Sequence, residues 1–269
     1  MIVSTMTLSE IYAQIMSDKD FLTAKNIIFF QNQWRRFAMK ATRFPCIKTT
    51  EVTSPKTRIT YTIRLWSFTH SQWKNPQFVW YVKHVHEGGT TVFSTSVNPD
   101  NSSSLDVYTP HFLARYKERI MKDESKTVDE VINDLFLYNN HTIVHKSENL
   151  GSLIKEDEKY YSGDNIHFFG QRVIDGIFIS EVSDENPLIY VHNTIVSTDL
   201  FTRSQNKNSI ISEWEVRLLS ICDRAPTRKY SLEKQLEELA ESCDKDHLSM
   251  EEANKRISSW LDKLEEQVY

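Results

Sequence analysis

The chain has 269 residues, of which 39% are hydrophobic and 12% aromatic, so it can bury a sizeable core. Its formal net charge is -5. Its six glycines form no glycine-rich phosphate-binding pattern, which argues against the common nucleotide-binding folds. Because the three cysteines lie far apart and no segment reaches the roughly 18 apolar residues of a membrane span, we expect a cytoplasmic protein with reduced cysteines, no cofactor and no membrane contact.

Charge is distributed unevenly along the chain. Residues 21–84 contain eleven lysines and arginines and one acid, Glu51, which gives this region a net charge of +10. Residues 228–269 contain seven basic and eleven acidic residues, a net charge of -4. A segregated basic region is typical of proteins that bind an anionic polymer, RNA above all. An acidic tail that covers the basic region explains the pattern equally well, so the sequence leaves both interpretations open.

The first 44 residues are predicted to be helical. Thr7–Met16 has the pattern of a short helix, and Asp20–Thr42 that of a long helix that ends before Pro45. We predict that the cations of the long helix and of the strand after it are exposed and bind RNA; these residues are Arg35, Arg36, Lys40, Arg58 and Arg64. Aromatic residues among these cations are candidates for base stacking or for the core: Trp34, Tyr61, Trp66, Trp73 and Trp80.

Residues 45–97 are predicted to form an antiparallel meander. In Thr57–Leu65 apolar residues alternate with Arg and Thr, which indicates a half-buried strand with a basic outer face. Gln77–His86 and Thr90–Val97 flank Gly88-Gly89, and this dipeptide allows the positive φ angles of a tight hairpin. Together with the helices before it, this meander makes up a predicted basic region over residues 1–97.

The polar segment Asn98–Ser104 is predicted to be a boundary loop, and residues 104–205 a second α+β unit. This unit opens with a helix over Tyr108–Met121, and the capping box from Thr127 to Glu130 marks the start of the next helix. Four strands are predicted after these helices: His141–Lys146, Ile166–Arg172, Val173–Glu181 and Leu188–Val196.

The helix over Tyr108–Met121 carries the candidate catalytic residues. At about 100° per residue, His111, Arg115, Glu118 and Arg119 lie on one stripe of this helix. Apolar residues fill the adjoining face, so one face is expected to pack against the protein and the other to remain available for chemistry.

This order of elements resembles a known group of proteins. A helix with His-x3-Arg-x3-Arg, a second helix and a four-stranded meander are similar to the small ribonuclease toxins around RelE, EndoU and the colicin-type RNases. The matching residues are His111, Arg115 and Arg119 on the helix and Thr194 on the last strand. The resemblance implies that these four residues cleave RNA without a metal ion.

The chemistry of RNA cleavage fits the same residues. Attack by the 2'-hydroxyl needs a base of near-neutral pKa, an acid, and cations that face the phosphate. His111 and the two arginines have these properties, and the Thr194 hydroxyl is suited to hold a phosphate oxygen. Glu118, however, lies three residues after Arg115, so a salt-bridged surface helix explains the stripe as well. Catalysis, phosphate binding without chemistry and a structural role all remain open.

Other chemistry is weakly indicated. His84 and His86 share a predicted strand face, as do His141 and His145, and two imidazoles are ordinary metal ligands. His84 and His86 lack a third ligand in the local sequence, and His141 and His145 would match a metal pair only on a helix. We therefore predict no metal site and partly buried histidines near Gly88-Gly89. No serine lies in a nucleophile-elbow pattern, and Ser-His-Asp chemistry is therefore not predicted.

Residues 206–269 are predicted to form a helical tail with helices over Ser209–Cys222, Ser231–Cys243 and Ser249–Val268. The last helix begins with a capping box and carries an apolar stripe of 3.6-residue period. This stripe packs either against the preceding helix or against a second copy or another protein.

The sequence thus predicts an α+β protein with antiparallel meander sheets, flanking helices and a helical tail. Its predicted function is RNA binding, with metal-independent endoribonuclease activity of a toxin-like kind as the enzymatic extension. The alternative is a non-enzymatic protein-interaction or assembly module that uses the basic surface and the carboxy-terminal helices.

Overall fold

The computed structural model describes residues 2–22, 26–74, 76–97, 103–139, 143–145, 168–197, 199 and 216. The chain divides into two compact units, Met1–Val216 and Arg217–Tyr269, and every described residue belongs to the first unit. Apart from Val216, which is helical and buried, the predicted tail lies outside the described residues. The predicted interface on its last helix also lies outside them.

The described elements follow the predicted order closely. The helices are α1 (Leu8–Ser17), α2 (Asn26–Ala38), the 3-10 helix η2 (His70–Lys74), α3 (Pro110–Tyr116), the π-helical turn η3 (Lys117–Met121) and α4 (Val128–Tyr138). The strands are β1 (Cys46–Thr53), β2 (Thr60–Ser67), β3 (Gln77–His86), β4 (Gly89–Val97), β5 (Ser103–Tyr108), β6 (Ile143–His145), β7 (Phe168–Val173), β8 (Gly176–Ser183) and β9 (Asn186–Ser197). The α+β class is confirmed.

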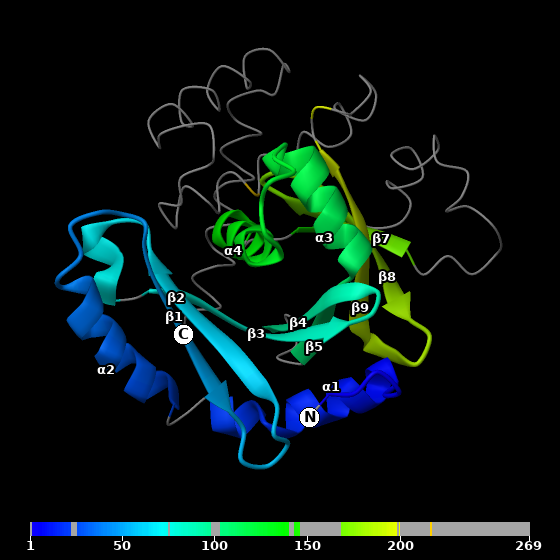
Figure 1. The fold of residues 1–269 in the computed structure, drawn as a ribbon, viewed down its shortest axis with the longest axis horizontal. Helices are drawn as coiled ribbons and strands as arrows, with labels where there is room; N and C mark the ends of the chain where they lie inside the picture. The colour runs from blue at the N-terminus through cyan, green and yellow to red at the C-terminus, as the bar shows by residue number, and fades with distance from the viewer. Residues whose placement is uncertain are drawn as a thin grey trace, which may run out of the picture. The chain divides into compact units, whose positions relative to one another are not determined.

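Nine described strands form one sheet in the order β1-β2-β3-β4-β5-β9-β8-β7-β6 (Figure 1). Two antiparallel meanders, β1 to β5 and β6 to β9, meet where β5 pairs with β9 in parallel. Among the described strands, this is the only parallel pair. The mostly antiparallel sheet was therefore predicted correctly, whereas the joining of the two meanders into a single sheet was not foreseen.

Strand β5 is absent from the predicted elements. The sequence placed a loop over Asn98–Ser104 and a helix from Tyr108, but Ser103–Tyr108 is a fully buried strand, and the helix starts at Pro110. Buried polar residues hide this strand from a hydrophobicity pattern, because Ser104 is 0% and Asp106 only 4% exposed.

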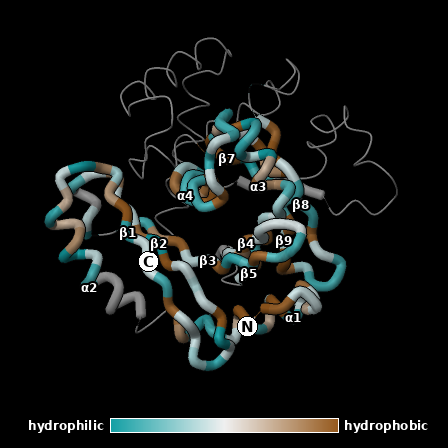
Figure 2. The backbone as a smooth tube through the Cα atoms, viewed as in Figure 1, coloured by the Kyte–Doolittle hydropathy of each residue, from teal (hydrophilic) through white to brown (hydrophobic). Residues whose placement is uncertain are grey.

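Both faces of the sheet are covered in its central part. One core contains residues of α1, α2 and the strands β1 to β5 and β9, among them Ile15, Trp34 and Leu105. The second core joins α3 and α4 to the opposite face, and Phe112 and Ile132 are fully buried within it. Hydrophobic segments accordingly recur along the strands and on α1 (Figure 2). Because helices cover both faces of the sheet here, an alternation of polar and apolar residues along a strand does not show which side faces solvent.

Several helix starts are fixed by local capping. The predicted capping box at Thr127 is confirmed: the Thr127 hydroxyl accepts a hydrogen bond from the Glu130 amide, and the Glu130 carboxylate accepts one from the Thr127 amide. Thr7 forms the same motif at α1. Thr109 caps α3 ahead of Pro110, so the helix starts two residues after the predicted Tyr108. These caps fix where α3 and α4 leave the sheet, and thereby the position of the predicted catalytic stripe.

Glycine positions fix the hairpin that lies against α3. β3 and β4 are joined through Glu87 and Gly88, and Gly89 has a φ of +120°, which a residue with a side chain rarely adopts. A Cβ atom at Gly89 would lie 3.0 Å from the Cβ of Pro110, so the glycine also allows close approach to the first residue of α3. The predicted hairpin is confirmed.

Candidate functional site

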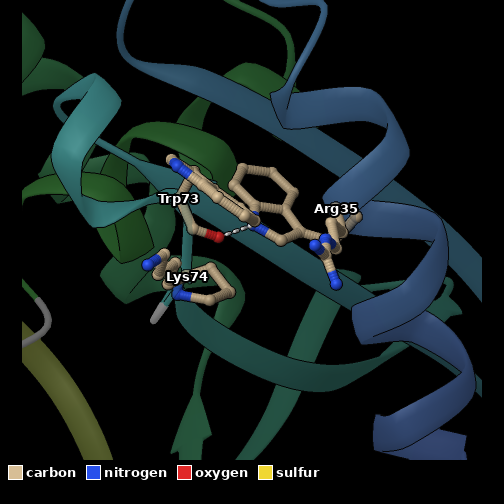
Figure 3. Close-up of a pocket in the computed structure, with 5 residues that line it drawn as sticks. Arg35, Trp73 and Lys74 are labelled. Atoms are coloured by element: carbon tan, nitrogen blue, oxygen red, sulfur yellow. Dashed lines mark hydrogen bonds between the residues drawn. The ribbon is translucent and has the colours of Figure 1, made fainter.

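The strongest candidate site is a basic and aromatic surface formed by α2, β1 and η2. We call it the α2–η2 surface and define it by Arg35, Phe37, Lys48, Trp73 and Lys74. Trp34, Arg35, Trp73, Lys74 and Pro76 line a pocket of about 230 Å³ on it (Figure 3).

A buried indole connects the two helices of this surface. Trp34 is 1% exposed, and its Nε1 donates a hydrogen bond of 2.9 Å to the backbone oxygen of Trp73 (Figure 3). Trp34 also lies against Phe37, with 5.7 Å between the ring centroids. Because Trp34 is held in the core, it fixes η2 relative to α2 and leaves the side chain of Trp73 half-buried at the pocket.

Cations surround the exposed aromatic rings. The Arg35 guanidinium carbon lies 5.5 Å and the Lys74 Nζ 5.8 Å from the centre of the Trp73 ring. The Lys48 Nζ lies 6.0 Å from the centre of the Phe37 ring, and it donates a hydrogen bond to Gln33. Each of these separations falls within the range of cation–π attraction.

The positive charge of this surface is not compensated locally. Within the described residues no carboxylate forms an ion pair with the cations of this area, which are Arg35, Arg36, Lys40, Arg43, Lys48 and Lys74. A cation without an acidic partner favours contact with an anionic ligand.

Four of the five predicted RNA-binding residues are exposed. Arg35, Arg36 and Lys40 are exposed on α2 and just after it, and Arg58 is exposed between β1 and β2. Arg58 has a φ of 62°, and its amide bonds to the Ser54 carbonyl, so its backbone belongs to a tight turn.

The predicted exposure of Arg64 is wrong. Its side chain is 3% exposed because α4 covers this face of β2, and its Nη1 donates a hydrogen bond of 2.5 Å to the backbone oxygen of Asn133. Burial lowers the pKa of Arg64, and the negative charges that Tyr81 and Asp134 carry when ionised act in the opposite direction. The basic outer face predicted for this strand does not exist, since both faces of β2 are buried.

The interleaved aromatic residues are divided between core and surface. Trp34, Tyr61 and Trp66 are almost fully buried, whereas Trp73 and Trp80 are half-buried against the same core. Sequence reasoning did not single out Phe37, which is 39% exposed on α2. Its place directly after the predicted RNA-binding residues Arg35 and Arg36 was the signal in the sequence that could have identified it.

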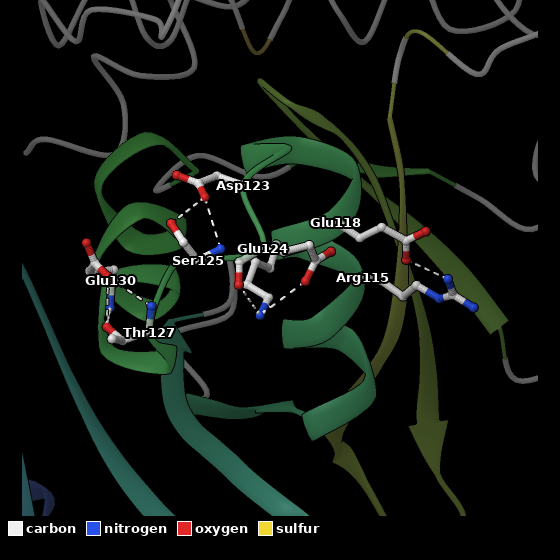
Figure 4. A network of polar contacts seen from close by, with 8 residues as sticks. Arg115, Glu118, Asp123, Glu124, Ser125, Thr127 and Glu130 are labelled. Carbon is white, nitrogen blue, oxygen red and sulfur yellow. Dashed lines mark hydrogen bonds and ion pairs between the residues drawn. The ribbon is translucent and has the colours of Figure 1, made fainter.

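The predicted catalytic stripe lies on α3 and η3 and is divided between two sets of contacts. The Arg115 Nη1 lies 2.6 Å from the Glu118 Oε2, so these residues form the i,i+3 ion pair that the sequence allowed (Figure 4). The Arg119 Nη1 donates to the Ile195 carbonyl at 2.7 Å and to the Thr194 hydroxyl at 3.4 Å. The structure thus brings Arg119 and Thr194 together and places Arg115 with Glu118.

His111 is exposed in the first turn of α3 and forms no hydrogen bond or ion pair with the described residues. When it is protonated, it acts electrostatically on Glu118. The pKa of Glu118 is lowered, chiefly by the hydrogen bond from Arg115 and further by the charges of Arg115, Arg119 and His111. Since both guanidinium groups already bind protein oxygens, the contacts favour a salt-bridged helix surface that also anchors η3 to β9.

The structure contains a Ser-His-Asp arrangement that the sequence did not indicate. His192 Nδ1 lies 2.7 Å from the Ser180 hydroxyl, and its Nε2 lies 3.1 Å from the Asp106 carboxylate. All three residues are buried, with exposures of 0%, 0% and 4% for His192, Ser180 and Asp106, and the imidazole stacks on Tyr108 at 4.5 Å. A buried group of this kind joins strands and does not meet a substrate. No local motif reveals it, because Asp106 and His192 are 86 residues apart.

The histidine pair on β3 is engaged within the protein. His84 and His86 stack with their centroids 5.5 Å apart. His86 Nδ1 accepts a hydrogen bond from the Gly88 amide, and its Nε2 bonds to Thr91. Both nitrogens of His86 are therefore used, and in the described part of the chain no three His, Cys, Asp or Glu side chains gather as a metal site would require. His141, Cys222 and Cys243 lie outside the described residues.

Comparisons with protein-family models, curated proteins and solved structures find no match for this chain. Among the described residues, no helix is both long enough and apolar enough to cross a membrane.

Proposed function

We propose that this protein binds RNA through the α2–η2 surface. The observation that carries the proposal is the Trp73 ring at the edge of a pocket, with the cationic groups of Arg35 and Lys74 within 6 Å of its centre. A base stacks on an aromatic face while neighbouring cations neutralise its phosphates, and proteins that bind nucleic acid combine these two contacts.

The surrounding charge supports the same conclusion. Six cations of this area lack ion pairs within the described residues, and Glu51 is the single acid in residues 21–84. A polyanion gains from such a surface chiefly by releasing its bound counterions, so its affinity depends steeply on salt. An acidic protein surface is the alternative ligand, but it lacks the regular array of a phosphate and a flat base in every unit that a nucleic acid offers.

Binding is tested by fluorescence anisotropy with a labelled octauridylate over a range of salt concentrations. The logarithm of the association constant falls linearly with the logarithm of the salt concentration, and each phosphate contact with a single strand makes this slope steeper by about 0.7. Arg35→Gln should lower the affinity and reduce the slope by about 0.7. Lys122→Gln is the matched control, because Lys122 is exposed and pairs with Asp199 elsewhere on the protein. Equal effects of the two variants would reject a specific surface.

Ribonuclease activity is a separate proposal for the stripe on α3 and η3. Its support is the contact between Arg119 and Thr194, two of the four predicted catalytic residues, together with the exposure of His111 in the first turn of α3. If the stripe is catalytic, the purified protein cleaves RNA in EDTA and His111→Ala abolishes the cleavage. Arg115→Ala and Arg119→Ala should each lower the rate by roughly 10²- to 10³-fold. Absence of cleavage in EDTA by the wild-type protein would leave the protein a binding module.

A further inference from the structure

We propose that a second pocket, between the β3–β4 hairpin and the helices α3 and α4, binds a medium-chain aliphatic carboxylate. The alkyl chain lies in the pocket, and the carboxylate contacts Lys117 and Lys126. The pocket has a volume of about 280 Å³. It belongs to the face of the sheet that α3 and α4 cover and shares no residue with the α2–η2 surface, so this binding is independent of RNA binding.

Most of the side chains that line this pocket are apolar. They belong to Pro110, Leu113, Ala114, Val128 and Val131. Leu113 and Val131 are buried and belong to the second core, so they form the floor of the pocket. Ala114 and Val128 are exposed and form its rim. Apolar walls that remain in contact with water favour the binding of an alkyl chain, because the chain removes this surface from water.

An exposed valine extends the apolar rim. Val85 is 75% exposed and pairs with Thr90 across the hairpin. Residues that face each other in antiparallel strands project on the same side of the sheet, and Thr90 lines the pocket. Val85 and Val128, which is 45% exposed, therefore add apolar surface beside the pocket that a ligand can cover.

Lysines carry the charge of the lining. Of the described residues that line the pocket, only Lys117 and Lys126 are charged. The Lys126 Nζ lies 3.1 Å from the Glu130 carboxylate. The Lys117 Nζ lies 3.3 Å from the Glu124 carboxylate and donates a hydrogen bond to the Glu124 carbonyl. Neither carboxylate lines the pocket, so the charge that a ligand in it meets is positive.

Both lysines can bind a further anion. An ammonium group has three donors, and the contacts of Lys117 and Lys126 with described residues leave at least one donor on each. Their acidic partners are largely exposed, and ion pairs of this kind contribute little to stability, so a ligand can share or replace them. A carboxylate has two acceptor oxygens, which suits two separate ammonium donors.

The walls of the pocket are fixed by contacts within the protein. The His86 Nδ1 accepts a hydrogen bond from the Gly88 amide and holds the hairpin turn. A Cβ atom at Gly89 would lie 3.0 Å from the Cβ of Pro110, so the turn lies directly against the start of α3. The capping box of Thr127 and Glu130 fixes the start of α4 (Figure 4). Binding to walls that are already ordered costs little conformational entropy.

The test is a titration of the protein at pH 7 with octanoate, hexanoate, octanol and octylamine. Binding is followed by the methyl signals of Leu113, Val128 and Val131 in carbon–proton NMR spectra. Octanoate should bind more tightly than hexanoate by about fourfold for each added methylene. Octanol lacks the charge and should bind roughly tenfold more weakly than octanoate. Octylamine should bind most weakly, because its charge is repelled by the lysines.

Two variants separate the chain site from the charge site. Ala114→Leu fills the pocket at an exposed helix position and should weaken octanoate and octanol alike, by more than about tenfold, while the melting temperature is kept. Lys126→Gln should weaken octanoate by roughly tenfold and leave octanol unchanged. Lys122→Gln is the matched control, since Lys122 is exposed, pairs with Asp199 and does not line the pocket.

Three results would overturn the proposal. Octanoate binding that Ala114→Leu leaves intact would place the ligand elsewhere on the protein. Equal affinities for octanoate and octanol, or no effect of Lys126→Gln, would exclude recognition of the carboxylate. If octanoate shifts none of the methyl signals but an apolar peptide does, the pocket serves a protein partner and the carboxylate proposal is wrong. RNA binding is judged separately, by the effect of Arg35→Gln on octauridylate.

Discussion

The Nε2 of His192 on β9 lies 3.1 Å from the Oδ1 of Asp106 on β5, and this contact joins the two meanders at their parallel junction. A register shift between Ile179 and Ser180 of β8 pairs Ile179 with Thr194 but Ser180 with His192, so Asn193 is the extra residue of a β-bulge. The bulge places His192 and Ile195 against the same core, although their odd spacing would otherwise put them on opposite faces.

The first prediction concerns this contact. Asp106→Leu leaves the buried His192 Nε2 without its hydrogen-bond partner, so we expect the free energy of unfolding to fall by about 1–3 kcal/mol. The double variant with His192→Phe removes both polar groups and should lose less than the sum of the two single variants. Urea unfolding of the four proteins of this cycle measures the coupling. Additive losses would show that the two side chains do not interact.

Arg64 gives the second prediction. Because its guanidinium is buried beneath α4 and far from solvent, Arg64→Met should leave the affinity for octauridylate within about twofold of wild type. The substitution also removes the hydrogen bond to the Asn133 carbonyl, so we expect the free energy of unfolding to fall by about 1–3 kcal/mol. Arg35→Gln serves as the comparison in the same anisotropy measurement. A larger loss of affinity in Arg64→Met than in Arg35→Gln would contradict the structure.

The third prediction is a dependence of stability on alkaline pH. Burial, followed by the hydrogen bond to Asp18 and its charge, raises the pKa of Tyr61 well above its ordinary value of 10.0. The folded protein therefore keeps a proton that the unfolded chain releases above pH 10. This stabilisation is complete below pH 10 and is lost as the pH rises beyond it.

Tyr61→Phe isolates this contribution, since Tyr81 and Tyr108 also have raised pKa values. At pH 8 the variant should be less stable by about 1–3 kcal/mol, because the buried Asp18 carboxylate loses one of its hydroxyl donors. Between pH 8 and pH 11 its free energy of unfolding should fall less steeply than that of the wild type. Parallel curves would show that Tyr61 ionises freely in the folded protein.

The fourth prediction tests the ion pair on the stripe. The hydrogen bond from Arg115 is the largest cause of the lowered pKa of Glu118, so Arg115→Gln should raise that pKa toward its ordinary value of 4.5. Because the pKa of Glu118 is lowered in the folded protein, the pair stabilises the protein above pH 4.5, and this stabilisation is lost as the pH falls below 4.5. NMR titration of the Glu118 carboxyl carbon measures the pKa. Lys126→Gln, which removes the cation paired with Glu130, should leave the pKa of Glu118 unchanged.

Local physical chemistry was sufficient for much of the fold. The helix starts at Thr7 and Thr127 were predictable because a cap involves only residues within one turn of each other. The β3–β4 hairpin was predictable because Gly89 removes the restriction on φ at that position. The ion pair between Arg115 and Glu118 could be expected from the sequence as one alternative, because residues three apart on a helix lie next to each other.

The tertiary structure decided what depends on contacts between distant elements. Alternation along β2 was real, but it could not show that α4 would cover the second face and bury Arg64. Asp106 and His192 meet because a parallel pair and a bulge bring two strands into register, and neither leaves a mark in the local sequence. Trp34 and Trp73 look equivalent in the sequence. Trp34 is buried because it lies on the face of α2 that packs on the sheet. Trp73 lies on η2, beside this helix, and lines the pocket.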